Sequence, residues 1–407
     1  MHSFTLGPFL PRSEYATAQI QMHDGFRLTV EKSPVPGVVV MAATGAGLLY
    51  EGAYGVRSAE SREPMTLDTV FRIASMTKAV TSVAAMQLVE QGKLELDQPV
   101  PDIDPALTSP QVLEGFDESG APRLRPTHRA ITLRHLLTHT AGFSYEMWDV
   151  NTIRYIKKTG TPSYMTGRLA GLRLPLSFDP GDRWNYGINT DWVGRIVEAV
   201  SDQPLEDYFR KHIFDPLGMN DTSYAISPER ASRQASVHKR KGDGSLEPRP
   251  LETVFTPEFR GGGGGLHSTA PDFLVLLQML LHSGTLGGAQ ILRPQTVALM
   301  AQNQIGNLPV RVLKTAMPEL TNDVDLLPGV QLGWGLGFMI NLQPAPAGRG
   351  AGSLSWAGLY NTYYWIDRSR NVTGVFMSQV QPFADAAVLN LYDHFERHVY
   401  NLVAPLQ

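Results

Sequence analysis

A serine and a lysine three positions apart could act together as a nucleophile and its base. They are Ser75 and Lys78, in the stretch FRIASMTKAV at residues 71–80. Positions i and i+3 lie on one face of a helix, so the Lys78 amine can approach the Ser75 hydroxyl. A serine hydroxyl needs such a base to become a nucleophile, and burial can lower the pKa of a lysine until it shares the proton near neutral pH. The pair therefore indicates covalent catalysis through Ser75.

The residues around this pair predict a buried helix that begins at the serine. A strand-like run, TVFRIA, precedes it, and apolar residues recur at helical spacing through TKAVTSVAAMQLVEQG as far as Gly92. The N–H groups and dipole of a helix N-terminus favour negative charge at Ser75. The alternative is that Ser75 only caps the helix and that Lys78 is a surface residue. Ser236 and Lys239 repeat the spacing, but within RQASVHKRKGDGS, which has no apolar face and predicts a solvated loop.

Tyr186 is the candidate for a second proton-transfer group. It lies in FDPGDRWNYGINTDWVG, residues 178–194, on an expected loop just before an amphipathic helix. A tyrosine can act as a base when a nearby cation holds it as phenolate, and Lys78 would supply that cation. The alternative is an ordinary core tyrosine, one of 14 in the chain.

Apolar periodicity predicts a sheet built from both ends of the chain. Residues 35–56 and 361–380 each contain two β-branched or aromatic runs around a turn, which is typical of a hairpin. Between them, TLRHLLTHTAG, TDWVGRIVEAVSDQ, LEDYFRKHIFDPLG and APDFLVLLQMLLHSG show helical spacing. We therefore expect an α/β protein in which residues 1–98 and 256–407 form an α/β domain, with an antiparallel sheet flanked by helices. Residues 99–255 are expected to form a mainly helical domain.

Six stretches in a fixed order carry a family resemblance. They are FRIASMTKAVT, LRHLLTHTAG, PGDRWNYG, IFDPLGMNDTSY, GGGGGLHST and WAGLYNTYYWID, within a region from about residue 35 to residue 380. In this order they resemble the serine β-lactamase-like superfamily, which holds class C β-lactamases, D-Ala-D-Ala carboxypeptidases and the family VIII carboxylesterases with their transacylase relatives. The resemblance implies a β-lactamase/DD-peptidase-like fold, with the site in the cleft between the two domains. The glycine run, taken alone, predicts a close-packed turn or hinge.

Carried over position by position, the resemblance gives a role to each candidate residue. Ser75 resembles the acylated nucleophile, Lys78 its proton-sharing partner and Tyr186 the general base and acid. The backbone N–H groups of Ser75 and Leu359 resemble the oxyanion hole. The resemblance implies no cofactor and no metal.

Two departures from the superfamily pattern bear on the substrate. In the β-lactamases and carboxypeptidases, an asparagine two positions after the tyrosine holds the substrate's amide side chain, and Ile188 stands here. Their late strand carries K-T-G, whereas Trp356, Ala357 and Gly358 stand here, close to the W-x-G of family VIII esterases. An apolar indole cannot pair with a substrate carboxylate. We therefore expect ester substrates and poor turnover of ordinary penicillins.

Smaller features complete the comparison with the esterase pattern. Ala357 and Asn361 stand where glycines are usual, and a literal KTG at Lys158–Gly160 precedes Tyr186 in an expected polar loop, which makes it a chance match.

An apolar pocket for the ester is expected, and the alternative for each candidate is ordinary core packing. The pocket candidates are Trp356, Ala357, Gly358, Phe143, Tyr145, Trp148, Trp334 and Tyr360.

Together these residues predict a serine carboxylesterase that hydrolyses short-chain carboxylic esters through a Ser75 acyl-enzyme. The alternatives on the same chemistry are an acyltransferase and a β-lactamase or D-amino-acid peptidase. A non-catalytic binding protein on this fold is a further alternative, disfavoured by the presence of Ser75, Lys78 and Tyr186 together. No G-x-S-x-G stretch occurs in the chain, which excludes the general α/β-hydrolase arrangement.

Composition narrows the expected partner to a small molecule. The 35 Lys and Arg and 39 Asp and Glu residues are mixed along the chain and form no basic stripe for nucleic acid. The absence of cysteine fits a reducing cytoplasm, and the longest apolar run, FLVLLQMLL, is much shorter than the roughly 20 residues of a membrane span. His135 and His139 have i, i+4 spacing but lack the H-E-x-x-H glutamate, so zinc is not expected.

Overall fold

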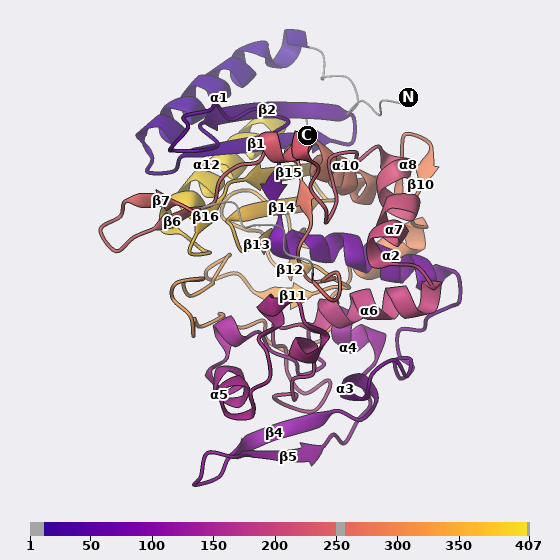
Figure 1. Ribbon diagram of the computed structural model, residues 1–407. Coiled ribbons are helices and arrows are strands. Elements are labelled where there is room, and N and C mark those ends of the chain that lie inside the picture. The colour runs from indigo at the N-terminus through magenta and orange to yellow at the C-terminus, as the bar shows by residue number, and fades with distance from the viewer. Residues whose placement is uncertain (1–11, 250–256, 405–407) are drawn as a thin grey trace.

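The computed structural model describes residues 12–249 and 257–404, and a seven-stranded sheet forms its centre (Figure 1). The strand order is β11-β12-β13-β14-β15-β1-β2, and every neighbouring pair is antiparallel. The strands are β1 (Gly37–Thr44), β2 (Gly47–Gly55), β11 (Leu332–Trp334), β12 (Met339–Asn341), β13 (Leu354–Gly358), β14 (Thr362–Asp367) and β15 (Val372–Met377).

Both predicted hairpins are confirmed, and they lie side by side in the sheet. β1 pairs with β2, and β14 pairs with β15. The two hairpins join where Val40 of β1 pairs with Phe376 of β15, so the sheet is assembled from both ends of the chain as predicted. β1, β14 and β15 are buried along their whole length, which requires helices on both faces of the sheet.

Helices cover the two faces of the sheet. Successive strand residues point to opposite faces. In β14, the Trp365 ring packs on Phe395 of α12 at 5.7 Å between centroids, and the preceding Tyr364 packs on Phe273 of α10 at 5.3 Å. Helix α1 lies beside α12 and β2, on the α12 side. The bounds are Arg12–Lys32 for α1, Ala270–Leu281 for α10 and Ala386–Val403 for α12.

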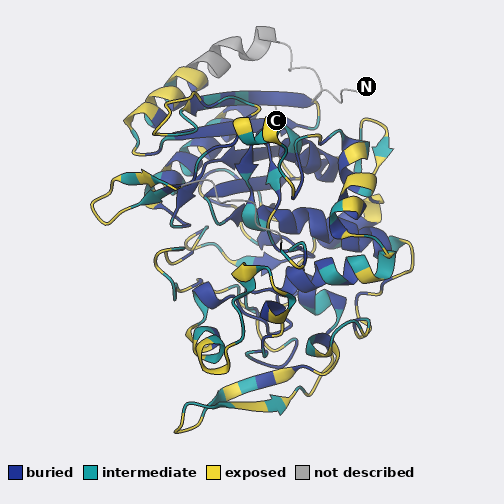
Figure 2. Ribbon diagram, viewed as in Figure 1, coloured by how far each residue is buried: buried dark blue, intermediate teal, exposed yellow. Residues whose placement is uncertain are grey.

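The helix predicted after Ser75 is present as α2 (Thr77–Glu90). It is buried from Thr77 to Leu88, on all sides and not along one face only. It packs on α6 (Asn189–Ser201) and α7 (Leu205–Phe209), and the β11–β12 turn approaches it so closely that a Cβ on Gly337 would meet Ser82. Figure 2 shows α2 and the central strands as the most continuous buried part of the molecule. A helix in this position holds its first residues rigidly, which suits a catalytic role.

All four predicted helical stretches contain helices, several of them shorter than their apolar pattern. A hairpin, β4–β5, was not predicted and lies at the far end of the helical part (Figure 1). Besides short 3₁₀ turns, the remaining elements are α3 (Pro105–Thr108), α4 (Leu133–Leu137), α5 (Val150–Thr159), a π-helical turn (Arg210–Phe214), α8 (Asp215–Leu217), α9 (Pro228–Ser232), α11 (Pro294–Met300), β3 (Phe71–Arg72), β4 (Gln111–Phe116), β5 (Pro122–Pro126), β6 (His238–Arg240), β7 (Leu246–Pro248), β8 (His267–Ser268), β9 (Thr285–Leu286), β10 (Ala289–Gln290) and β16 (Val380–Gln381).

Three local predictions are wrong. The second Ser-x-x-Lys does not lie in a solvated loop, because it enters β6, which pairs in parallel with β16 and buries His238. The KTG at Lys158–Gly160 does not lie in a loop either, since it ends α5 with Gly160 in the left-handed region at φ 72°. Helix α4 ends at Leu137, so His139 does not share a helix with the earlier histidine. Pairing between distant strands and the positions of helix ends determine the structure at these three places. Neither can be read from the local spacing of apolar residues.

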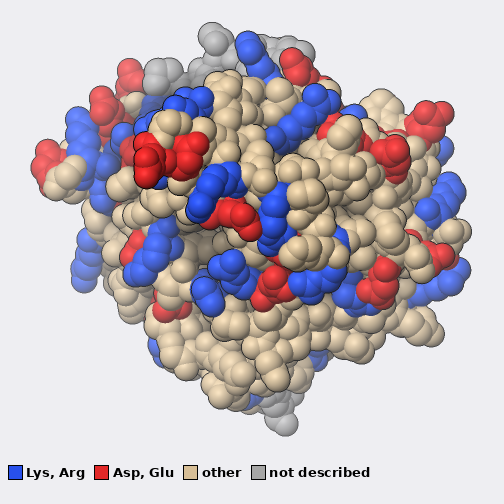
Figure 3. Space-filling model, turned by 90° about the horizontal axis from the view of Figure 1, so that it is seen from below, with Lys and Arg blue, Asp and Glu red and all other residues tan. Residues whose placement is uncertain are grey.

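The division into two domains stays a prediction. Its first boundary, between residues 98 and 99, follows α2, and the second, between 255 and 256, lies outside the described residues. Within the described residues, no helix is long and apolar enough to cross a bilayer. On the face seen in Figure 3, Lys and Arg side chains alternate with Asp and Glu, and no large field of one sign forms.

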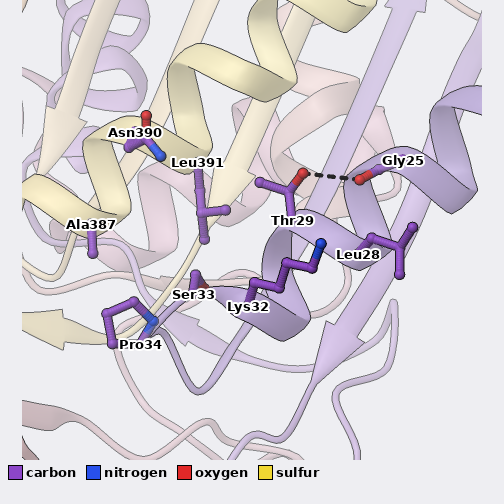
Figure 4. A pocket seen from close by; sticks show the side chains of 9 residues that line it. All are labelled: Gly25, Leu28, Thr29, Lys32, Ser33, Pro34, Ala387, Asn390 and Leu391. Carbon is purple, nitrogen blue, oxygen red and sulfur yellow. Dashed lines mark hydrogen bonds between the residues drawn. The ribbon is translucent and has the colours of Figure 1, made fainter.

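A surface hollow of about 500 Å³ lies between α1 and α12 (Figure 4). Its walls combine apolar and polar side chains, and none of them is among the residues predicted to do chemistry. The candidate catalytic residues lie elsewhere, around Ser75. The lining residues are Gly25, Leu28, Thr29, Lys32, Ser33, Pro34, Ala387, Asn390 and Leu391.

Candidate active site

Ser75 lies in a tight turn between β3 and the helix that carries Lys78. β3 pairs with β8, and the chain then forms a 3₁₀ turn over Ala74–Met76 before α2 begins. Ala74 has a φ of 42°, near the left-handed region that residues with a Cβ rarely adopt. Strained turns of this kind gather at functional sites, where they aim a side chain. The turn leaves Ser75 half-buried at the start of α2.

The Lys78 amine lies beside Ser75, as the spacing predicts. Its Nζ is 3.2 Å from Ser75 Oγ, 2.7 Å from the carbonyl oxygen of Gly263 and 3.0 Å from the hydroxyl oxygen of Tyr145. The side chain is 1% exposed, so the alternative of a surface lysine is wrong. Burial lowers the pKa of Lys78 to about 7, against the opposing effect of the Asp191 carboxylate. Such an amine can accept and return the Ser75 proton near neutral pH.

Tyr186 completes the group around Ser75. Its oxygen accepts a hydrogen bond from Nε1 of Trp356 at 2.9 Å, and it lies near enough to Ser75 for the serine to lower the pKa of the phenol. The Lys78 ammonium position lies 4.8 Å from the centre of the phenol ring. Burial raises the pKa of Tyr186, and the opposing influence of Ser75 and of the Trp356 N–H offsets this only in part. Tyr186 is therefore a neutral phenol at rest, and not the phenolate that we expected.

His139 holds the loop that carries Tyr186. Its carbonyl oxygen accepts from the backbone N–H of Asn185 at 2.8 Å, and its Nδ1 accepts from the N–H of Gly187 at 3.4 Å and the side-chain amide of Asn189 at 3.0 Å. The imidazole packs on the Tyr186 ring at 4.6 Å. His139 adopts a left-handed backbone, with φ 57°, and burial lowers its pKa well below the ordinary value. A neutral His139 thus binds the backbone N–H groups of both residues that flank Tyr186.

Three further groups of the site were not predicted from the sequence in this role. The Tyr145 hydroxyl, expected only as a pocket wall, donates to Oδ2 of buried Asp191 at 3.0 Å. The backbone N–H of Gly263 donates to Oδ1 of the same carboxylate at 3.0 Å, and its carbonyl oxygen receives Lys78. The one sequence signal for Asp191 is a charged residue amid the buried first turn of α6.

The glycine run is the close-packed turn that was predicted. A Cβ on Gly262 would come within 2.4 Å of the Thr190 carbonyl oxygen, and one on Gly263 would come within 2.4 Å of the Asp191 carboxylate. Side chains at these positions would therefore push the turn away from α6. Glycine is required here by close approach, which brings the Gly263 carbonyl to Lys78.

The comparisons with known proteins agree with this geometry. A family model described as Beta-lactamase matches residues 26–397. The chain belongs to the Beta-lactamase family. It is 32% identical to the monacolin J acid methylbutanoyltransferase of Aspergillus terreus, over 97% of this chain and 98% of the relative, and 32% identical to the lovastatin esterase of Penicillium rubens, over 93% and 98%. The structure of simvastatin synthase (LovD) from Aspergillus terreus, as its LovD6 mutant, matches with a TM-score of 0.83 and 31% identity, over 96% and 98%.

These matches establish the fold and the general class of enzyme to which this Beta-lactamase family member belongs. The predicted superfamily and the β-lactamase/DD-peptidase-like fold are confirmed. The relatives are serine-hydrolase-type enzymes, and so is this chain. The reactions named for the relatives include both acyl transfer and ester hydrolysis.

Of the predicted pocket residues of this family member, four aromatic ones lie around Tyr186. Tyr145, Trp148, Trp334 and Trp356 surround the Tyr186 ring, with centroids 5.3, 5.4, 6.4 and 4.8 Å away. Tyr164, which was not predicted, packs on Tyr145 at 4.8 Å. Phe143 is fully buried against Trp192 and belongs to the core behind the site, whereas Tyr360 is half-buried and lies near enough to Tyr164 to raise the pKa of that phenol.

Strand β13 brings the predicted oxyanion strand against the Ser75 turn. Gly358 lies so close that a Cβ would be 2.3 Å from the Ile73 carbonyl oxygen. Leu359 follows directly, so its backbone N–H stays a candidate for the oxyanion hole with that of Ser75. Ala357 pairs with Tyr363 in β14 and projects to the face of the sheet opposite Trp356, which leaves only its backbone on the Trp356 side.

The departure at Asn361 has a structural reason. The residue adopts a left-handed conformation, with φ 62°, in the turn from β13 to β14. Asparagine tolerates this region better than other residues with a side chain, which explains how it replaces a glycine. Its amide also donates to the carbonyl oxygens of Val380 and Pro382 at 2.8 and 2.9 Å. The turn is therefore held more firmly than a glycine would hold it.

Proposed function

We propose that this enzyme is a serine acyltransferase that carries an acyl group on Ser75 and passes it to the hydroxyl of a small molecule, with hydrolysis of the same acyl-enzyme as a second reaction. The observation that carries the proposal is the position of Ser75 Oγ, 3.2 Å from a near-neutral amine, Lys78, and near a neutral phenol, Tyr186. One group can take the serine proton while the other supplies a proton to the leaving alcohol.

Acylation needs two proton transfers in opposite directions. Ser75 Oγ attacks the ester carbonyl, and Lys78 takes the hydroxyl proton. The backbone N–H groups of Ser75 and Leu359 receive the negative charge on the carbonyl oxygen. Tyr186 then gives its proton to the departing alkoxide, and the phenolate that remains is stabilised by the Trp356 N–H and the Lys78 ammonium.

Deacylation reverses these transfers and restores the site. The acceptor hydroxyl attacks the acyl carbonyl and gives its proton to the Tyr186 phenolate. Ser75 leaves as an alkoxide and recovers its proton from Lys78. Every proton returns to its starting group, so acceptor choice alone decides between transfer and hydrolysis.

The balance between the two outcomes differs from the expectation of a simple carboxylesterase. The relatives named as a methylbutanoyltransferase and as simvastatin synthase favour the alternative, acyl transfer, while the lovastatin esterase supports hydrolysis as the second reaction. Aromatic walls also favour an apolar alcohol over water. They are Tyr145, Trp148, Tyr164, Trp334 and Trp356.

Product partitioning tests the proposal directly. The enzyme is incubated with p-nitrophenyl butyrate and increasing amounts of an apolar alcohol, and the ester and acid products are measured by mass spectrometry. We expect the new ester to exceed free butyrate at saturating alcohol and Ser75→Ala to form neither product nor a butyryl adduct. Free acid alone at every alcohol concentration would make the enzyme a hydrolase, and an active Ser75→Ala variant would remove the acyl-enzyme altogether.

A further inference from the structure

The carboxyl group of Asp191 is a buried acidic group of the site to which the proposed mechanism gives no role. Its side chain is 3% exposed. Burial raises its pKa, and the Lys78 amine and the donors on Gly263 and Tyr145 oppose that rise. Oδ2 accepts from the Tyr145 hydroxyl and Oδ1 accepts from the Gly263 backbone N–H, both at 3.0 Å. The same Tyr145 oxygen and the Gly263 carbonyl oxygen are the two protein acceptors closest to the Lys78 amine besides Ser75. Both supports of Lys78 are therefore held by one carboxylate.

The hydrogens on Lys78 can be counted from these contacts. A neutral amine has two N–H groups and one lone pair. The Gly263 carbonyl oxygen can only accept, so it takes one N–H at 2.7 Å. The Tyr145 hydroxyl has a single proton, which it donates to Asp191, so towards Lys78 it can only accept the second N–H at 3.0 Å. The lone pair is then the one part of the amine left for Ser75, whose Oγ lies 3.2 Å away.

We propose that Asp191 is a positioning residue that sets the direction of proton transfer from Ser75 to Lys78, acting through the Tyr145 hydroxyl. By taking the Tyr145 proton, the carboxylate makes that oxygen an acceptor and turns the lone pair of Lys78 towards Ser75. This inference rests on the proposed acyl-enzyme function. After the transfer, Lys78 has three N–H groups and three acceptors, on Gly263, Tyr145 and Ser75, so no group needs to rotate.

Asp191→Asn reverses the direction of the hydrogen bond between residue 191 and Tyr145 while keeping the shape of the side chain. An amide has one acceptor and one donor end. The Gly263 N–H is fixed by the backbone and takes the amide oxygen, which leaves the amide N–H₂ facing Tyr145. The Tyr145 proton must then turn to the lone pair of Lys78, where it competes with Ser75. We expect kcat for p-nitrophenyl butyrate to fall by about 100-fold or more, with KM little changed, since a lost base costs about that much.

A double-mutant cycle distinguishes the proposed action of Asp191 through the Tyr145 hydroxyl from a purely structural role. In Tyr145→Phe there is no hydroxyl to reverse, so adding Asp191→Asn should cost at least about tenfold less than it does in the wild type, a coupling typical of contacting residues. Equal losses in the two backgrounds would overturn the proposal, because they would mean that Asp191 acts without Tyr145. Asp202→Asn, at the exposed end of the same helix, is the matched control and should keep wild-type kcat.

The remaining outcomes are also decisive. If Asp191→Asn does not fold, Tyr145→Phe alone tests the inference. A reduced kcat at unchanged KM supports the action of Asp191 through Tyr145, and a wild-type kcat overturns it. If Ser75→Ala is inactive and Asp191→Asn keeps wild-type kcat, this inference fails and the proposed function stands. An active Ser75→Ala variant removes both.

Discussion

At the scale of single residues, the site depends on a lysine that is neutral when the reaction begins. Burial lowers the pKa of Lys78 to about 7, so the amine is the dominant form above this pH and the ammonium below it. Only the amine can take the Ser75 proton. The charged or titratable neighbours are Asp191, which raises the pKa of Lys78, neutral His139, and Tyr145 and Tyr186, whose own raised pKa values keep them protonated.

The rate of acylation is therefore expected to rise with pH through about 7 and to level above it. Each pH unit below that midpoint should lower the rate about tenfold, because it lowers the amine fraction by that factor. Stopped-flow release of p-nitrophenol between pH 5 and 9 measures this. In Lys78→Ala the residual rate should lose this dependence. A wild-type profile that stays flat down to pH 5 would contradict the role of Lys78 as the base.

Trp356 is expected to act through one hydrogen bond on the Tyr186 oxygen. The bond stabilises the phenolate more than the phenol, so Trp356→Phe should lower kcat about 10- to 100-fold, as expected for a hydrogen bond of about 1.5–3 kcal/mol to a charged group. Trp334→Phe is the matched control. That ring also packs near Tyr186, but its N–H donates to the Leu137 carbonyl oxygen. Equal losses of kcat in the two variants would assign the effect to packing alone.

The serine, the lysine and the tyrosine could be predicted because residue type and spacing carry their chemistry. The positions of Asp191 and the Gly263 carbonyl could not be predicted, since they depend on the contact between α6 and the glycine turn. Tyr145 was predicted as an apolar wall, and its hydroxyl proved to be the part that contacts Lys78. Local sequence points to the groups that we propose to react, and it does not point to those that we propose to orient them.

At the scale of elements, the Tyr186 loop is positioned by the left-handed turn after α4. His139→Asn keeps an acceptor at the δ position and a residue that tolerates φ near 57°, whereas His139→Leu removes both. We expect the leucine variant to lose about 100-fold in kcat, as small misplacements of catalytic groups can do, and the asparagine variant to keep most of the activity. Steady-state kinetics with p-nitrophenyl butyrate measure the difference. A leucine variant as active as the asparagine variant would show that Tyr186 needs no support from His139.

Elements were predictable where pairing was local. The β1–β2 and β14–β15 hairpins join neighbouring segments, and their alternating apolar runs and turns identify them. β6 and β16 are about 140 residues apart and pair only through the tertiary fold, so the stretch around Ser236 appeared to be a loop. The left-handed backbone of His139 and the π-helical turn after α7 likewise have no periodic signature.

At the scale of the whole molecule, a buried ion pair connects the last helix, α12, to the loop before β13. The Arg349 guanidinium, in the loop between β12 and β13, forms two hydrogen bonds of 2.6 Å with Glu396 of α12 and one of 2.7 Å with Tyr392. Both charged side chains are 3% exposed. The pair thereby joins the last helix to the loop that leads into β13, the strand of Trp356.

Glu396→Gln is expected to destabilise the fold while leaving the chemistry intact. It leaves a buried guanidinium without a counter-charge, which should lower the free energy of unfolding by about 3–5 kcal/mol. Asp393→Asn, which breaks the exposed pair with Arg397 one turn away, is the matched control and should cost no more than about 1 kcal/mol. Urea unfolding measures both, and kcat of the folded Glu396→Gln variant at low temperature should equal that of the wild type. A large loss of kcat with normal stability would instead mean that α12 influences the site through β13, because no other described contact of Glu396 leads there.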